Sequence, residues 1–209
     1  MQEINNKLKG FIQLETPRLI LRRLQKSDAA DMYEYARIPE VTEYLLWEAH
    51  PDIEYTASYI ASVQRYYKNG QYFDYAVILK EEDKMIGTCG FARVDDLNRC
   101  GEIGYVLNPA YRSRGYASEA ARALMKMGFT ELGLHRIEAR YMVKNTASRR
   151  VMERCGMTFE GVHRGMMLVR GRFEDIGICS AMAGEFLEKY GNDDSRALFR
   201  RSLFFSLYG

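Results

Sequence analysis

The sequence predicts an α/β fold in which helices flank a mixed, mostly antiparallel sheet. Strand-like and helix-like segments alternate along the 209 residues in the order β, α, α, β, β, β, α, β, α, β, β, which is typical of layered α/β domains. The three successive strands favour an antiparallel start. The strand, helix and strand that follow them favour a crossover connection in the middle of the chain.

The first half of the chain begins with a short apolar run over residues 18–24, followed by a helix for which Ser27 and Asp28 offer an N-cap. A second helix is expected over residues 51–69, because apolar side chains there recur every three or four residues. Two β-rich runs then meet at a charged turn and predict an antiparallel hairpin; they cover residues 72–79 and 84–94.

The second half alternates between strand and helix. Residues 102–107 read as a strand in which Glu102 and Val106 share one face and Tyr105 lies on the other. The segments after it are a helix over 115–132, a strand over 136–143, a helix from Asn145 to Gly156, two strands between 157 and 182 that turn at Arg170 and Gly171, and a short helix to Tyr190.

The expected domain covers residues 12–190, and residues 191–209 form a C-terminal extension. Leu198, Phe199, Leu203 and Phe204 recur there at near-helical spacing. The extension could be a helix that docks on the body or on a second subunit, so a homodimer stays open. The alternative is a loosely ordered tail.

Composition excludes several classes of protein. Thirty Lys plus Arg against 28 Asp plus Glu leave a formal charge of +2, without the basic field of a protein that coats nucleic acid or anionic membrane. The four cysteines form no C-x-x-C pair, so we expect reduced thiols and no metal site. No stretch approaches the roughly 18 apolar residues of a membrane span. These features predict a cytoplasmic protein.

The most informative segment is a strand that runs into a loop and then directly into a helix. The loop carries Arg112, Arg114 and Gly115. Backbone N–H groups and the positive end of the helix dipole converge there on an anion. Glycine allows a close approach and arginines add charge-assisted hydrogen bonds, so a pyrophosphate fits. Neither a Walker loop nor a dinucleotide fingerprint is present.

These segments resemble the GNAT superfamily of acetyl-coenzyme A dependent N-acetyltransferases. The resemblance rests on R-S-R-G-Y-A at 112–117 and on N-T-A-S-R-R-V-M-E-R-C-G-M at 145–157. L-E-T-P-R-L-I-L-R at 14–22 and P-E-V-T-E-Y-L-L-W at 39–47 are similar to the branch that acetylates ribosomal-protein N-termini. The resemblance spans about residues 12–188. It implies a sheet of about seven strands with a splayed strand pair that receives the cofactor.

The resemblance implies a set of cofactor-binding residues for acetyl-CoA. The loop and helix start would hold the pyrophosphate, and the backbone of the splayed strand would hold the pantetheine arm. The start of the late helix would reach the distal pantetheine or the sulfur, and either Arg149 or Arg150 would touch the phosphates. The residues at the matching positions are Val106, Leu107, Arg112, Ser113, Arg114, Gly115, Tyr116, Ala117, Ser118, Asn145 and Arg149.

The resemblance also places two residues at chemical positions. Glu102 matches a carboxylate that serves as general base in some members, and an ammonium acceptor must lose a proton before it attacks a thioester. Ser148 would stabilise or protonate the leaving thiolate, because the tyrosine that many members use seven residues after the Asn is Met152 here. Val106 or Leu107 would offer an N–H to the oxyanion.

Each assignment has a structural alternative. Glu102 could be a strand carboxylate that orders a water, and Ser148 and Asn145 could only cap a helix. Tyr44 and Trp47 could line the acceptor cleft or pack in the core. The three histidines, His50, His135 and His163, are expected to be structural or solvated.

The predicted function is transfer of an acetyl group to a primary amine by direct attack. By resemblance, the preferred acceptor is a protein N-terminal α-amine such as that of a ribosomal protein. A polyamine, an amino acid or an antibiotic is the alternative acceptor. Two further alternatives are a coenzyme A-binding regulatory module without catalysis and a nucleotide-binding protein.

Overall fold

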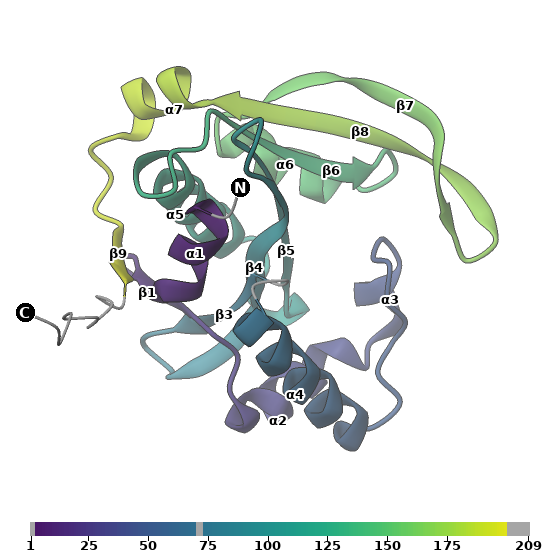
Figure 1. Ribbon diagram of the computed structural model, residues 1–209. Helices are drawn as coiled ribbons and strands as arrows, with labels where there is room; N and C mark the ends of the chain where they lie inside the picture. Colours follow the sequence, from purple (N-terminus) through teal and green to yellow (C-terminus); the bar gives the residue numbers. More distant parts are fainter. Residues whose placement is uncertain (1–2, 70–72, 200–209) are drawn as a thin grey trace, which may run out of the picture.

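The computed structural model describes residues 3–69 and 73–199, and its centre is one mixed sheet (Figure 1). The sheet has nine strands in the order β7-β8-β6-β5-β4-β3-β2-β1-β9. Every neighbouring pair is antiparallel except β5 and β6. The predicted fold class is therefore confirmed, with more strands than the seven expected.

Five strands form an antiparallel meander in the first half of the chain. They are β1 (Phe11–Glu15), β2 (Leu19–Arg22), β3 (Phe73–Leu79), β4 (Lys84–Asp95) and β5 (Cys100–Leu107). The crossover helix α5 (Tyr116–Thr130) then returns the chain to β6 (Arg136–Met142), and the hairpin of β7 (Thr158–Val169) and β8 (Arg172–Met182) completes this side of the sheet.

The two additional strands are β1 and β9 (Arg196–Phe199), which pair with each other at one edge of the sheet. The expectation of a helix across the extension is wrong for residues 196–199. The free edge of β1 offers backbone hydrogen bonds, and this register packs Ala197 against the core while Leu198 stays 48% exposed. Residues 200–209, with Leu203 and Phe204, lie outside the described residues.

The parallel pair β5–β6 is short and ends abruptly. Its register joins residues 100–103 of β5 to residues 136–139 of β6, and the last pair is Ile103 with Ala139. Residues 104–107 continue to pair with β4 on the other side. Within the described residues, this end of β5 has no strand partner on the β6 side, as a splayed pair requires.

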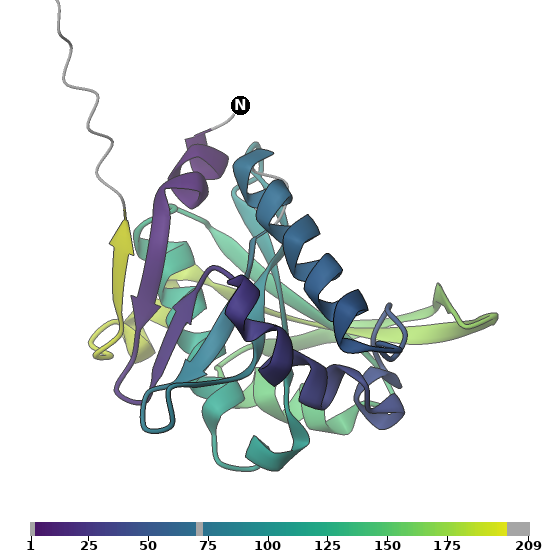
Figure 2. The ribbon, with the colours of Figure 1, turned by 90° about the horizontal axis from the view of Figure 1, so that it is seen from below.

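Helices cover both faces of the sheet (Figure 2). One cluster packs α5 together with α1 (Glu3–Gly10) and α7 (Ala183–Tyr190) against the sheet. A second cluster packs α2 (Ala29–Ala36) and α4 (Ile53–Asn69) against β3 and β4. The sequence analysis did not foresee α1, whose Ile4 and Leu8 are buried.

The remaining short elements are η1 (Lys26–Asp28), α3 (Pro39–Thr42), η2 (Pro109–Tyr111) and α6 (Thr146–Arg154). Asp28 precedes α2 as expected, but its carboxylate accepts hydrogen bonds from Arg22 and from the Gln25 N–H instead of capping the helix. None of the described helices combines the length and apolar character needed to cross a membrane.

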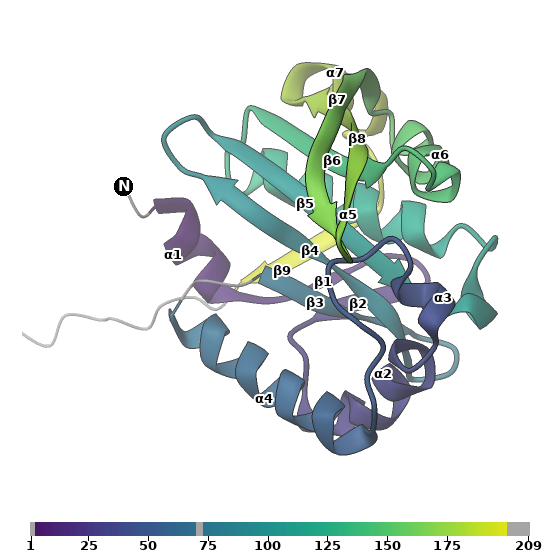
Figure 3. The same ribbon diagram turned by 90° about the vertical axis from the view of Figure 1, so that its right-hand side faces the viewer.

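The β7–β8 hairpin forms an arm that extends past the rest of the sheet (Figure 1), and Figure 3 views this arm from its tip. Its turn is at Arg170 and Gly171, as predicted. The Arg170 guanidinium donates to the carbonyl oxygens of Thr42, Glu43 and Trp47 at 2.8, 3.2 and 3.0 Å. The tip of the arm therefore holds the segment after α3 in place.

Candidate active site

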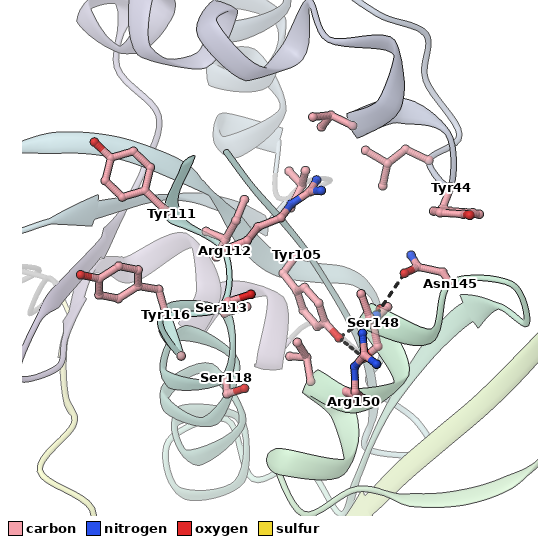
Figure 4. Close-up of a pocket in the computed structure, with 18 of the residues that line it drawn as sticks. Tyr44, Tyr105, Tyr111, Arg112, Ser113, Tyr116, Ser118, Asn145, Ser148 and Arg150 are labelled. Carbon is pink, nitrogen blue, oxygen red and sulfur yellow. Dashed lines mark hydrogen bonds between the residues drawn. The ribbon is translucent and has the colours of Figure 1, made fainter. Parts of the chain in front are cut away.

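A pocket of about 710 Å³ lies where β5 and β6 part (Figure 4). Its walls are the end of β5, the first turn of α5, the start of α6 and the α3 segment. Of the predicted site residues, the pocket is lined by Tyr44, Val106, Leu107, Arg112, Ser113, Gly115, Tyr116, Ala117, Ser118, Asn145 and Ser148, whereas Trp47, Glu102, Arg114 and Arg149 lie outside its lining.

The N-terminus of α5 forms one wall. Gly115 is its N-cap, with a φ of 83° that only glycine adopts without strain. Along this turn, the Glu119 N–H is the first to donate a hydrogen bond to a backbone carbonyl, that of Gly115. In the described part of the chain, the N–H groups of Tyr116, Ala117 and Ser118 have no acceptor. They provide a row of free donors at the positive end of a helix dipole.

A network behind the pocket fixes this first turn. Glu119 accepts hydrogen bonds from Thr16 Oγ1 at 2.6 Å and from Arg18 Nε at 2.6 Å. Arg18 also donates to the Arg114 carbonyl at 3.1 Å and lies over the Tyr116 ring. The donors are thus held by residues 16–18 from β1–β2, about a hundred residues away in the sequence.

Three cationic side chains line the pocket. Arg112 lines it together with Arg150 and Arg154, which are four residues apart on α6. Arg149 points elsewhere, since its Nε binds Glu153 at 2.9 Å and its guanidinium lies 4.7 Å from the centre of the Phe159 ring. Of the two alternatives that the sequence left open, Arg150 lines the pocket and Arg149 does not.

The start of α6 forms the opposite wall. Asn145 caps the helix, as predicted, because its Oδ1 accepts the Ser148 N–H at 3.0 Å. The Ser148 hydroxyl lies 3.1 Å from the Tyr105 hydroxyl, which also donates to the Ser148 carbonyl at 3.0 Å (Figure 4). Burial raises the pKa of Tyr105 well above its usual range, so this phenol stays protonated. Met152 is buried in the core and cannot replace the tyrosine that it stands for.

Glu102 lies outside the pocket lining, one residue before the point where β5 and β6 part. It shares a face of β5 with Val106, which does line the pocket. Its carboxylate is 3.6 Å from Arg93 Nε and 3.5 Å from Arg140 Nε. Burial and the neighbouring Glu138 raise the pKa of Glu102, against the lowering effect of the two arginines.

The α3 segment lies across the pocket from the first turn of α5 (Figure 4) and contributes Glu40, Glu43 and Tyr44 to the lining. Trp47 packs beside the second core cluster and lies near His50. His50 is buried and its Nδ1 is 2.9 Å from Thr56 Oγ1. Burial lowers the pKa of His50, which fits the structural role expected of it.

Sequence reasoning did not identify Tyr105 or Arg154 as pocket residues, whereas it kept Arg150 as an alternative to Arg149. Tyr105 was read only as part of the apolar face of its strand, yet its ring reaches across the splay to Ser148. Arg150 and Arg154 share a helix face at i and i+4; this spacing is a signal that the sequence does contain. The described residues include no group of three or more His, Cys, Asp or Glu side chains that could hold a metal ion.

Comparisons with known proteins agree with this architecture. A family model described as an acetyltransferase (GNAT) domain matches residues 18–158. The chain belongs to the GNAT family. It is an N-acetyltransferase, as predicted, and it is 35% identical over 173 residues to the uncharacterized N-acetyltransferase p20 of Bacillus licheniformis, covering 83% of this chain and 97% of that protein.

Two further proteins are similar to this chain. The crystal structure of a GNAT acetyltransferase from Bacillus anthracis is 31% identical with a TM-score of 0.74, over 83% of this chain and 99% of that one. The [ribosomal protein uS5]-alanine N-acetyltransferase of Escherichia coli is 26% identical over 170 residues, which cover 78% of this chain and 87% of that protein. Ribosomal-protein acetyltransferases are thus distant relatives.

Proposed function

We propose that this GNAT enzyme transfers the acetyl group of acetyl-CoA to a primary amine without a covalent enzyme intermediate. The observation that carries the proposal is the row of unpaired N–H groups at Tyr116–Ser118, which opens on a pocket lined by Arg112 and Arg150. Backbone donors at a helix N-terminus together with arginines fit a pyrophosphate. The splayed end of β5 offers free backbone groups beside it.

The remaining cofactor contacts follow from this placement. Val106 and Leu107 would hydrogen-bond the pantetheine arm through their backbone, and Ser113, Gly115 and the first turn of α5 would hold the phosphates. Asn145 would face the distal pantetheine. Arg114, which lies 5.7 Å from the centre of the Tyr111 ring, and Arg149, which binds Glu153, are not proposed as phosphate ligands.

When bound, acetyl-CoA supplies an activated thioester carbonyl. In the proposed reaction Glu102 accepts a proton from the ammonium form of the acceptor, directly or through a water, because only the free amine attacks. The N–H of Val106 or Leu107 stabilises the oxyanion. As the C–N bond forms and the C–S bond breaks, the nitrogen gives up a second proton. The Ser148 hydroxyl either hydrogen-bonds the departing thiolate or donates its own proton to the sulfur and takes up the proton that the nitrogen releases. Tyr105 holds that hydroxyl in place.

The acceptor we propose is a protein N-terminal α-amine. The support is the relationship to the E. coli enzyme that acetylates an alanine of ribosomal protein uS5, and the pocket end bounded by the α3 segment, which we assign to the acceptor. A small amine, such as a polyamine, an amino acid or an antibiotic, is the alternative acceptor. A cytoplasmic location and a homodimer remain predictions, as do domain limits at 12–190.

A screen of peptides and small amines for thiol release from acetyl-CoA tests the proposal. Release with peptides carrying a free N-terminus, but not with N-formylated copies, is the expected result. Release only with small amines would favour the alternative acceptors. Binding of acetyl-CoA by calorimetry without release from any amine would favour the regulatory module. Stronger binding of ATP or GTP than of acetyl-CoA would favour the nucleotide-binding protein.

A further inference from the structure

Two carboxylates stand side by side next to the splay. Glu102 of β5 and Glu138 of β6 are partners in the parallel register, and only the pair Ile103 with Ala139 follows before the strands part. Both side chains lie mostly out of solvent, with 18% and 12% of their areas exposed. Two carboxylates so close cannot ionise independently.

The surrounding arginines contact the two carboxylates in different ways. Glu138 accepts hydrogen bonds from Arg140 Nη2 at 2.9 Å, from Arg93 Nη2 at 3.2 Å and from Arg136 Nη2 at 3.4 Å. The same Arg93 and Arg140 form longer ion pairs with Glu102, in which their Nε atoms lie 3.6 and 3.5 Å from Oε2. The Arg140 Nε is buried and makes no hydrogen bond within the described residues.

We propose that Glu138 and Arg140 are positioning residues for Glu102. Glu138 takes the direct hydrogen bonds of the arginines, so that Glu102 keeps its carboxylate oxygens free to accept the proton of the acceptor amine. Arg140 lies between the two carboxylates and keeps Glu102 ionised without binding it tightly. This inference rests on the proposed function of Glu102 and names the residues that make that function workable.

The other groups on this face do not change the assignment. The charged side chains that face Glu102 are Arg93 from β4, and Glu138 and Arg140 from β6. On the Glu138 face, β8 presents Ser180 opposite Glu138 and Ile178 opposite Arg140. Arg136 is turned toward the edge of the sheet, where Glu160 binds it with two contacts of 2.6 Å.

The pKa shifts of Glu138 and Glu102 agree with this assignment. Burial works to raise the pKa of Glu138, but hydrogen bonds and charge from Arg140 and Arg136 lower it overall. For Glu102, burial and Glu138 outweigh the arginines and raise the pKa. Neighbouring titratable groups whose pKa values are pushed apart are a recurring arrangement of catalytic acids and bases.

The test is a titration of the Glu102 carboxyl carbon by ¹³C NMR in the full chain labelled at glutamate Cδ, with the signal assigned by its loss in Glu102→Gln. Glu138→Gln removes a like charge and should lower the pKa of Glu102 by roughly half a unit or more. Arg140→Gln removes an opposite charge and should raise it. Glu160→Gln is the matched control, because it changes the contact between Arg136 and Glu160. It should leave the pKa of Glu102 unchanged.

Opposite shifts in Glu138→Gln and Arg140→Gln, with an unmoved Glu160→Gln, support the inference. An unchanged Glu102 titration in both variants overturns it, and so does an equal shift in the control. If Arg140→Gln fails to fold, Glu138→Gln alone decides, with Arg140→Lys expected to keep Glu102 near its original titration. Failure of the proposed function would appear separately, as full acetyl transfer by Glu102→Gln.

Discussion

The two ends of the pocket are built in different ways. The proposed donor end consists mainly of backbone groups: the N–H groups of α5, the unpaired end of β5 and the cap of α6. The acceptor end consists of side chains on the α3 segment, which Arg170 holds from more than 120 residues away. A site made of backbone suits one constant ligand, whereas a site made of side chains can change its acceptor by substitution.

Glu102 lies beside the splay and is the proposed general base, so its replacement should have the largest effect. Glu102→Gln should lower turnover at neutral pH about a hundredfold, the range expected of a general base. The loss should shrink as pH rises, because the amine then deprotonates unaided. In the unmodified enzyme turnover should fall as pH falls through the pKa of Glu102, which is raised. A pH profile of kcat/KM checks this, and an equal loss at every pH would rule out Glu102 as the base.

The donor end should be most sensitive at Gly115. Gly115→Glu puts a carboxylate beside the free N–H groups and should raise the KM for acetyl-CoA at least tenfold. The change also costs about 1–2 kcal/mol of backbone strain, because φ is 83°. Gly133→Glu serves as the control, because Gly133 has a similar φ of 72° and does not line the pocket. Equal effects of the two variants on KM would contradict the donor site.

Arg150 and Arg149 form a natural pair for a sharper test of the donor end. Arg150→Ala should raise the KM for acetyl-CoA roughly five- to tenfold, as expected for one lost charge-assisted hydrogen bond. Arg149→Ala should change it less than twofold, because Arg149 binds Glu153 and Phe159. Steady-state kinetics with acetyl-CoA as the varied substrate distinguishes them. The reverse order of effects would return the role to Arg149.

Loss of the Arg170 contacts should have the smallest effect, and it should change the KM of the acceptor amine and not that of acetyl-CoA. Arg170→Ala frees the carbonyls of the α3 segment and should raise the KM of the acceptor roughly threefold, while the KM for acetyl-CoA stays unchanged. Arg172→Ala is the control, since this neighbouring side chain is exposed and has no polar contact recorded in the described part of the chain. A change in the KM for acetyl-CoA would show that the two ends are not separable.

The same contrast explains what the sequence could predict. The strand, loop and helix around Gly115 and the Asn145 cap depend on neighbours in the chain, and the sequence analysis found both. The fold class followed from the order of segments. The roles assigned to Glu102 and Ser148 remain predictions, for which the structure supplies only the surroundings.

The remaining features depend on partners far along the chain. Tyr105 lies one position from Val106, and the sequence left Arg149 and Arg150 as alternatives. Only the packing of β5 against α6 shows which of these side chains face the pocket. The strand at 196–199 forms because β1 leaves an edge unpaired. Its own apolar spacing pointed to a helix, so no local pattern could reveal that edge.

The short parallel pairing of β5 and β6 has a mechanical consequence. Four register pairs, residues 100–103 with 136–139, are the direct strand contact between a six-stranded half and a three-stranded half of the sheet. A pantetheine arm lying between the halves would bridge them with hydrogen bonds that the protein alone does not make. Donor binding would then slow amide exchange in both halves together, since a ligand held by the folded state stabilises all that it joins.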